Sequence, residues 1–118
     1  RHARAGGRLY DISAAVQQYA ESHGCGVVRD YVGHGIGAKM HEDPEVPNYV
    51  PPRGDHRANP RLLPGMTLAI EPMINEGTEE VFVDGDDDWS VYTKDGKASA
   101  QWEIQVLVTE DGHEVLSW

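Results

Sequence analysis

A glycine-broken segment at residues 31–44 constrains this chain more than any other stretch. Three glycines alternate with single residues around His34, and His41 follows seven positions later. Glycine has no Cβ, so it permits close backbone approach and dihedral angles that other residues avoid. The glycines let the chain fold so that both histidines point into one cleft, while a purely structural role for His41 stays open. We therefore expect this segment to contribute residues to the functional site of the protein.

Composition limits the partners that the chain can have. Its 118 residues suit one domain, which we treat as a single unit over 1–118. A formal net charge of −10 disfavours nucleic acid as a partner, because few cations are available to contact phosphates. No apolar run is long enough for a membrane span, so we expect no membrane partner. The chain begins at Arg1, and we expect it to be a piece of a longer soluble protein.

Cysteine usage gives a further constraint. Cys25 is the single cysteine, which excludes an internal disulfide and a cysteine-rich zinc site. The sequence therefore fits a reducing compartment, and we expect a cytoplasmic protein in which Cys25 is a small buried thiol.

Helical periodicity appears once, at residues 11–23. Its apolar positions recur at helical spacing, namely Ile12, Ala15, Val16, Tyr19 and Ala20. Asp11 is placed to cap the start, and Gly24 supplies a stop. We predict one amphipathic helix.

The remaining segments predict strands and loops. Residues 27–28 and 31–32 predict a short strand that enters the glycine-broken segment. Residues 44–64 hold six of the seven prolines, which predicts an extended surface loop. Residues 79–83 and 89–93 predict strands joined by an acidic turn at 84–88, and residues 114–117 predict an edge strand.

Two longer segments, residues 66–73 and 99–109, alternate like half-buried strands. Each carries one glutamate, Glu71 or Glu103, on the face opposite its bulky apolar side chains. Together with the helix, these strands predict an α+β fold, a mostly antiparallel sheet with a packed helix.

A histidine and two glutamates on separate strands can form a divalent metal site. The three candidates are His34, Glu71 and Glu103, whose imidazole and carboxylate groups suit Mn, Fe, Co or Zn. The alternative is that both glutamates lie on a solvated sheet face, where glutamate is common. The position of Glu71 favours the metal site, because an apolar strand ends there and Pro72 forces a break.

Several motifs occur together in an order that resembles the C-terminal half of a type I methionine aminopeptidase. They are Tyr31-Val32-Gly33-His34-Gly35-Ile36-Gly37, Met40-His41-Glu42-Asp43-Pro44 with Val46-Pro47-Asn48-Tyr49, Leu63-Pro64-Gly65-Met66 leading to Ile70-Glu71-Pro72-Met73, and Ser99-Ala100-Gln101-Trp102-Glu103. The Glu-Pro-Met and Val-Pro-Asn-Tyr pieces separate the chain from the related proline-cleaving peptidases.

The resemblance implies the pita-bread fold, whose two similar halves face a dimetal site, with residues 1–118 forming a partial domain that lacks its N-terminal half. It implies removal of the initiator methionine from nascent proteins, by attack of a metal-generated hydroxide on the first peptide bond. His34, Glu71 and Glu103 would be metal ligands for two divalent ions, and Glu71 would also shuttle a proton. His41 would contact the substrate at the scissile bond, and Met40 and Trp89 would help line the methionine pocket.

The resemblance also implies what this chain lacks. Two aspartate ligands and a further catalytic histidine would belong to the half that precedes Arg1, so the fragment alone is expected to be inactive. Ile104 and Gln105 follow Glu103, where the family often has histidine and threonine.

Two alternatives to this function are an X-Pro peptidase and a pita-bread binding module without catalysis.

Overall fold

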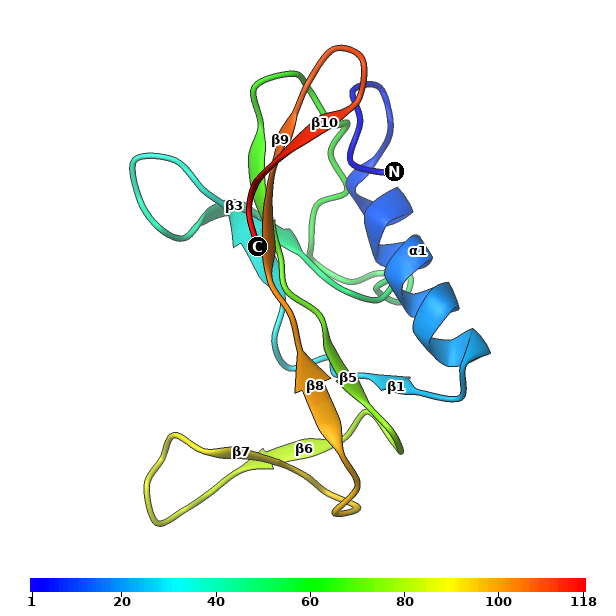
Figure 1. Ribbon diagram of the computed structural model, residues 1–118, viewed down its shortest axis with the longest axis vertical. Helices are drawn as coiled ribbons and strands as arrows, with labels where there is room; N and C mark the ends of the chain where they lie inside the picture. The colour runs from blue at the N-terminus through cyan, green and yellow to red at the C-terminus, as the bar shows by residue number, and fades with distance from the viewer.

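The computed structural model describes residues 1–118 and contains one helix and ten strands (Figure 1). Along the chain these are α1 (Leu9–Ser22), β1 (Gly26–Val27), β2 (Gly33–Gly35), β3 (Glu42–Val46), β4 (Thr67–Ile70), β5 (Met73–Asn75), β6 (Val81–Val83), β7 (Val91–Thr93), β8 (Ser99–Gln101), β9 (Ile104–Val108) and β10 (His113–Ser117). All strand pairs are antiparallel, so the predicted α+β class with a mostly antiparallel sheet is confirmed.

The helix begins earlier than the apolar spacing predicts. Asp11 lies inside the first turn, and its Oδ2 accepts a hydrogen bond of 2.7 Å from the backbone N–H of Arg8. This is the reciprocal part of a capping box, in which an acidic side chain reaches back to the residue before the helix. Leu9 and Ile12 are buried on the face that meets the sheet. With 14 residues, α1 is too short and too polar to cross a membrane.

The main sheet has five strands in the order β10-β9-β4-β2-β3. Helix α1 lies on one side of it, and the turn before β3 projects from the other side (Figure 1). Leu68 pairs with Val106 across β4 and β9, and both are almost fully buried. The core cluster consists of Ala3, Leu9, Ile12, Val46, Leu62, Leu68, Ile70, Val106 and Val108.

Each of the two long predicted strands is divided in two. β4 pairs with β9 as far as Ile70 opposite Ile104, and β5 pairs with β8 from Met73 opposite Gln101. Pro72 has no N–H to donate, yet its carbonyl oxygen accepts a hydrogen bond of 3.2 Å from the Trp102 N–H. β5 and β8 form a second, three-stranded sheet with β1. The chain therefore crosses from one sheet to the other at this break.

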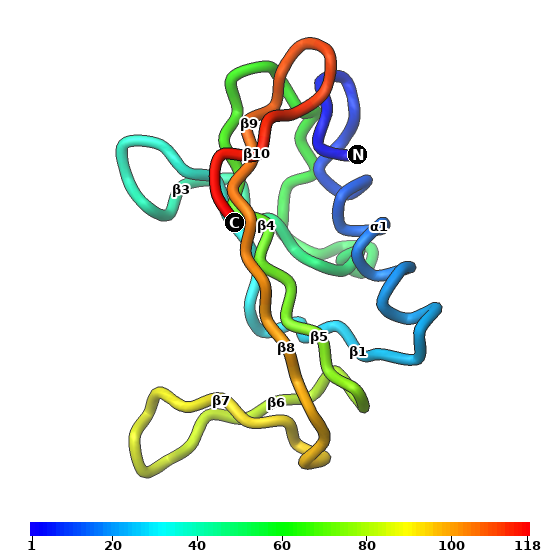
Figure 2. The backbone as a smooth tube through the Cα atoms, in the orientation of Figure 1, coloured from blue at the N-terminus to red at the C-terminus, as the bar shows by residue number.

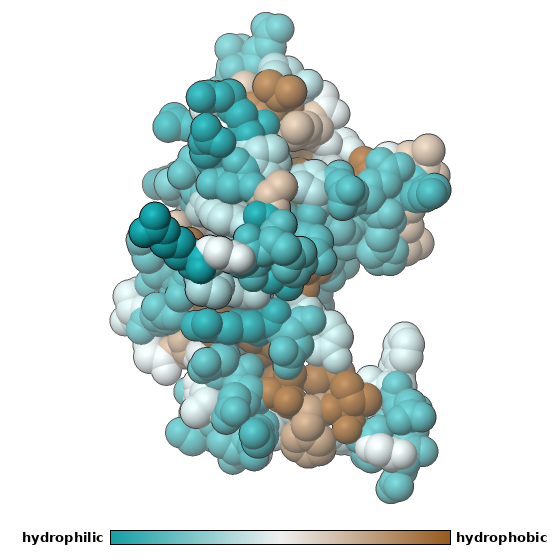
Figure 3. Space-filling view, turned by 180° about the vertical axis from the view of Figure 1, so that it is seen from behind, coloured by the Kyte–Doolittle hydropathy of each residue, from teal (hydrophilic) through white to brown (hydrophobic).

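The predicted hairpin is confirmed as β6 and β7, which form a separate two-stranded sheet. It extends away from the rest of the chain on the same side as the turn before β3 (Figures 1 and 2). The space-filling view from behind shows a hollow between these two projections (Figure 3).

The proline-rich segment is more ordered at its start than predicted. β3 occupies Glu42–Val46, so the expectation of a loop over residues 44–64 is wrong for its first residues. β3 is an edge strand, and a bulge displaces Asp43 and Pro44 from the ladder with β2. Proline is tolerated there because the edge needs no ladder bond from it. Likewise, residues 31–32 precede β2 rather than forming a strand.

Candidate metal centre

His34 lies in the middle of β2, opposite Ala69 on β4 and Glu45 on β3. Its Nδ1 is 2.9 Å from the carbonyl oxygen of Gly35. A carbonyl oxygen only accepts hydrogen bonds, so Nδ1 carries a proton and donates this bond, which leaves Nε2 as the ring nitrogen available to a metal. A backbone carbonyl on one ring nitrogen is the usual way to orient a metal-binding histidine.

Glu71 follows β4 directly, and its Oε1 is 3.2 Å from the His34 Nε2. Both side chains are mostly buried, at 14% exposure for His34 and 22% for Glu71. Burial raises the pKa of Glu71, and the nearby charge of Glu103 raises that pKa further, while His34 and His41 lower it. The pair thus places an imidazole nitrogen against a carboxylate oxygen at a distance that suits a shared proton or a shared cation.

Glu103 lies opposite Glu71 because the strand register continues through the break between the two sheets. Directly opposed residues of an antiparallel pair project to the same side. The sequence prediction that Glu71 and Glu103 share the face opposite the apolar side chains is therefore consistent with this register. Glu103 itself is exposed.

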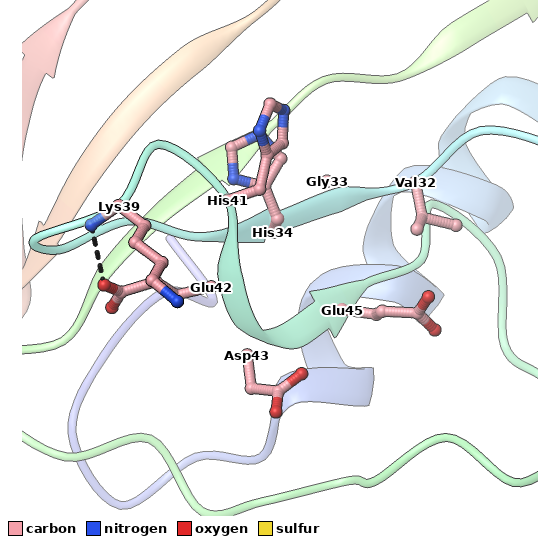
Figure 4. A pocket seen from close by; sticks show the side chains of 8 residues that line it. All are labelled: Val32, Gly33, His34, Lys39, His41, Glu42, Asp43 and Glu45. Carbon is pink, nitrogen blue, oxygen red and sulfur yellow. Dashed lines mark hydrogen bonds between the residues drawn. The ribbon is translucent and has the colours of Figure 1, made fainter.

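His41 ends the turn that precedes β3, and its ring lies against the His34 ring with centroids 4.3 Å apart. Both rings border a cavity of about 630 Å³ (Figure 4). The cavity is lined by Val32, Gly33, His34, Lys39, His41, Glu42, Asp43 and Glu45. The prediction that the two histidines share one cleft is thus confirmed.

The glycines around His34 confirm one of the two roles predicted for them, close backbone approach, and not the other, unusual dihedral angles. None of Gly33, Gly35 and Gly37 has a positive φ angle. A Cβ on Gly33 would overlap the carbonyl oxygen of Ala69, and one on Gly35 would overlap that of Asp43. The glycines therefore allow neighbouring backbone to approach β2 closely on both sides of His34.

The residues present fit a divalent cation in part. His34 and Glu71 offer one nitrogen and one oxygen donor, the ligand types that Mn, Fe, Co and Zn accept. Their 3.2 Å separation is the spacing of two ligands that share one ion. No three His, Cys, Asp or Glu side chains are close enough together to form a complete site. The chain thus holds a two-donor pair with Glu103 on the adjacent strand.

Met40 and Trp89 are both highly exposed, at 73% and 84%. Met40 precedes His41 in the turn, whereas Trp89 lies in the connection of the β6–β7 hairpin. No other residue of this chain packs either side chain into a pocket. Their assignment to a substrate pocket stays a prediction.

Glu42 is among the cavity residues that the sequence analysis did not assign to the site. The Oε1 atom of Glu42 accepts a hydrogen bond of 2.8 Å from the Lys39 N–H, within the turn that carries His41. Its signal in the sequence is a glycine, Gly37, five positions earlier, whose missing Cβ leaves room for the carboxylate.

Comparison with known proteins gives a consistent family. The model of metallopeptidase family M24 matches residues 1–110. The chain is 54% identical over 112 residues to methionine aminopeptidase from Clostridium acetobutylicum, covering 95% of this chain and 43% of the relative. It is 47% identical over 117 residues to methionine aminopeptidase 1 from Bacillus subtilis, covering 99% of this chain and 45% of the relative.

Solved structures agree in fold. The crystal structure of methionine aminopeptidase from Thermotoga maritima superposes with a TM-score of 0.86 at 47% identity, covering 96% of this chain and 43% of the other. That of methionine aminopeptidase from Rickettsia prowazekii gives a TM-score of 0.84 at 44% identity, with 95% and 44% covered. The chain therefore has part of the pita-bread fold and spans less than half the length of these proteins. The family match and the shared fold establish that this chain belongs to metallopeptidase family M24.

Proposed function

We propose that the protein containing this chain is a methionine aminopeptidase, which hydrolyses the first peptide bond of polypeptides that begin with methionine. The observation that carries the proposal is the His34–Glu71 pair, in which an imidazole nitrogen and a carboxylate oxygen face each other at 3.2 Å beside an open cavity. Relatives of that name at 47–54% identity support the substrate. Because the proposed substrates are nascent proteins, we also propose a cytoplasmic location for this protein.

His34, Glu71 and Glu103 would hold divalent metal through one imidazole nitrogen and the carboxylate oxygens. We propose two ions, chosen among Mn, Co, Fe and Zn, with further ligands from the rest of the same domain. Bound divalent metal would supply Lewis acidity, which lowers the pKa of water and polarises a peptide carbonyl. The cations also account for carboxylates at close range, because like charges without them favour protonation.

Two side chains of this chain would act on the reacting groups. The Glu71 carboxylate would take a proton from the attacking water and pass it to the leaving amine. His41 would donate a hydrogen bond to the substrate at the scissile bond and stabilise the charge that develops there. The contact between the His41 and His34 rings supports this role, because it places the donor next to the proposed ligand.

Substrate selection would involve the exposed side chains near the hollow. Met40 is adjacent to His41, and Trp89 belongs to the hairpin that borders the hollow (Figure 3). Both are apolar and exposed, so they are available to contact a methionine side chain. The peptide would enter with its N-terminus toward the metal ligands.

The test is release of methionine from a Met-Ala peptide by the full-length protein supplied with manganese or cobalt. We expect release that a chelator abolishes. Preferential cleavage of an X-Pro peptide would instead indicate an X-Pro peptidase. No cleavage of either peptide by the folded, metal-supplied protein would contradict the enzyme and favour a binding module.

A further inference from the structure

The carboxylate of Glu42 is directed back into the turn that carries His41. Glu42 is the first residue of β3, and its Oε1 accepts the Lys39 N–H at 2.8 Å (Figure 4). Gly37 lies on the other side of the carboxylate, where a Cβ would overlap both carboxylate oxygens and the carbon between them. The half-buried side chain thus reaches back against the turn.

No other side chain hydrogen-bonds to the backbone of the turn between Gly37 and His41. The turn is fixed at its start, where the Ile36 N–H donates to the Thr67 carbonyl oxygen at 3.0 Å and the Thr67 hydroxyl donates to the Ile36 carbonyl oxygen. The Gly37 N–H also donates to the carbonyl oxygen of Lys39 at 3.1 Å. Glu42 is therefore the link between the turn and the strand that follows His41.

We propose that Glu42 is a positioning residue, whose carboxylate holds residues 37–41 so that the His41 ring stays against the His34 ring. The His41 ring itself has no hydrogen bond within this chain, so its place depends on the turn and on the 4.3 Å ring contact. Misplacing a catalytic group by a small distance can cost about a hundredfold in rate. The consequence for turnover rests on the proposed function, whereas the effect on the His41 ring does not.

The first experiment measures methionine release by the full-length, metal-supplied protein. Glu42→Ala is expected to lower kcat roughly 10- to 100-fold with KM little changed, because His41 acts on developing charge. Glu42→Gln keeps an oxygen that accepts the Lys39 N–H, so it should recover most of the lost rate. In a His41→Ala background, Glu42→Ala should cause no further loss; an additive loss would overturn the proposal.

A second variant disturbs the same contact without removing the carboxylate. Gly37→Ala should push the flexible end of Glu42 out of the turn, and the φ angle of Gly37 permits alanine. Its kcat should fall like that of Glu42→Ala, and the two substitutions together should not be additive. Glu21→Ala is the matched control, because Glu21 also accepts an exposed hydrogen bond, from Gln17 on α1, away from the cavity.

The third measurement does not depend on activity. In the full-length protein, hydrogen exchange of the Lys39 amide and the nuclear Overhauser contact between the His34 and His41 rings report on the turn directly. Glu42→Ala and Gly37→Ala should speed the exchange and weaken the ring contact, and Glu42→Gln should do neither. An unchanged ring contact in Glu42→Ala overturns the proposal. Absence of peptide cleavage with an intact ring contact in the unmodified protein contradicts only the proposed function.

Discussion

The five-stranded sheet and the β6–β7 hairpin expose their apolar side chains very differently. Leu68 and Val106 in the sheet are 1% exposed, whereas Phe82 and Tyr92 in the hairpin are about half exposed. The two hairpin rings lie against each other, with centroids 5.9 Å apart. Buried side chains fix the backbone that they belong to, because the interior is close-packed. Packing in the core sheet thus fixes the position of His34, whereas the exposed hairpin has no such packing to fix it.

The largest effect is expected where the core sheet ends. Glu71→Gln keeps the size of the side chain and removes its charge and its capacity to accept a proton. We expect kcat of the full-length protein to fall by about 10²- to 10⁴-fold. Methionine release from Met-Ala measures the loss, with circular dichroism as the control for folding. Near-normal turnover would remove Glu71 from the proposed mechanism.

Within the core itself, Leu68→Ala should lower the free energy of unfolding by about 2–5 kcal/mol, because it leaves a cavity against Val106 and the helix. Urea unfolding of the full-length protein measures the change. A cost below about 1 kcal/mol would mean that the sheet is less tightly packed than the contrast with the hairpin requires.

The hairpin should respond in the opposite way. Trp89→Ala is expected to change the free energy of unfolding by no more than about 0.5 kcal/mol, since the side chain is exposed. If Trp89 lines the methionine pocket, KM for Met-Ala should rise roughly tenfold. Thermal unfolding and steady-state kinetics separate the two effects. A large loss of stability with unchanged KM would assign Trp89 to packing instead.

The smallest effect concerns the proline-rich segment beside the sheet. The Arg57 N–H donates to Asp55, which lowers the pKa of that carboxyl, and the Arg57 guanidinium adds to the shift. A carboxyl with a lowered folded pKa stabilises the protein above its ordinary value of 3.8, and this stability is lost as the pH falls through the folded pKa. Asp55→Asn should therefore lower the melting temperature slightly at neutral pH.

That difference should disappear in acid, because both proteins then carry a neutral side chain at position 55. Thermal unfolding of the two proteins from about pH 7 down to about pH 2, below the lowered pKa of Asp55, gives the comparison. A difference that persists unchanged at the lowest pH would assign the effect to lost packing rather than to charge.

Much of the core could be predicted from the sequence, because buried positions follow the regular spacing of apolar residues along each element. The alternation over residues 99–109 correctly assigns Val106 and Val108 to the buried face. The break at Trp102 and Glu103 could not be predicted, because a change of sheet leaves the alternation intact. Helix α1 also starts earlier than the sequence predicts, because an aspartate can cap a helix from inside its first turn as well as from the position before it.

For the candidate site, the sequence predicted the proximity of His34 and His41, and the structure adds the ring contact. The Gly35 carbonyl that orients His34 could not be predicted, because a backbone acceptor leaves no mark on residue identity. The contact of Glu42 with the Lys39 N–H also involves a backbone group, and its trace in the sequence is Gly37, which leaves room for the carboxylate. Side-chain patterns thus predict which groups meet, whereas the backbone determines how they are oriented.

The shared break in two neighbouring strands has one more consequence. Glu71 and Glu103 stand opposite each other where the five-stranded sheet meets the three-stranded sheet. They lie beside the backbone hydrogen bond from the Trp102 N–H to the Pro72 carbonyl oxygen. The angle between the two sheets therefore sets the distance between the two carboxylates. If Glu71 and Glu103 hold metal as proposed, a substitution that widens this angle would favour a larger cation without altering either glutamate.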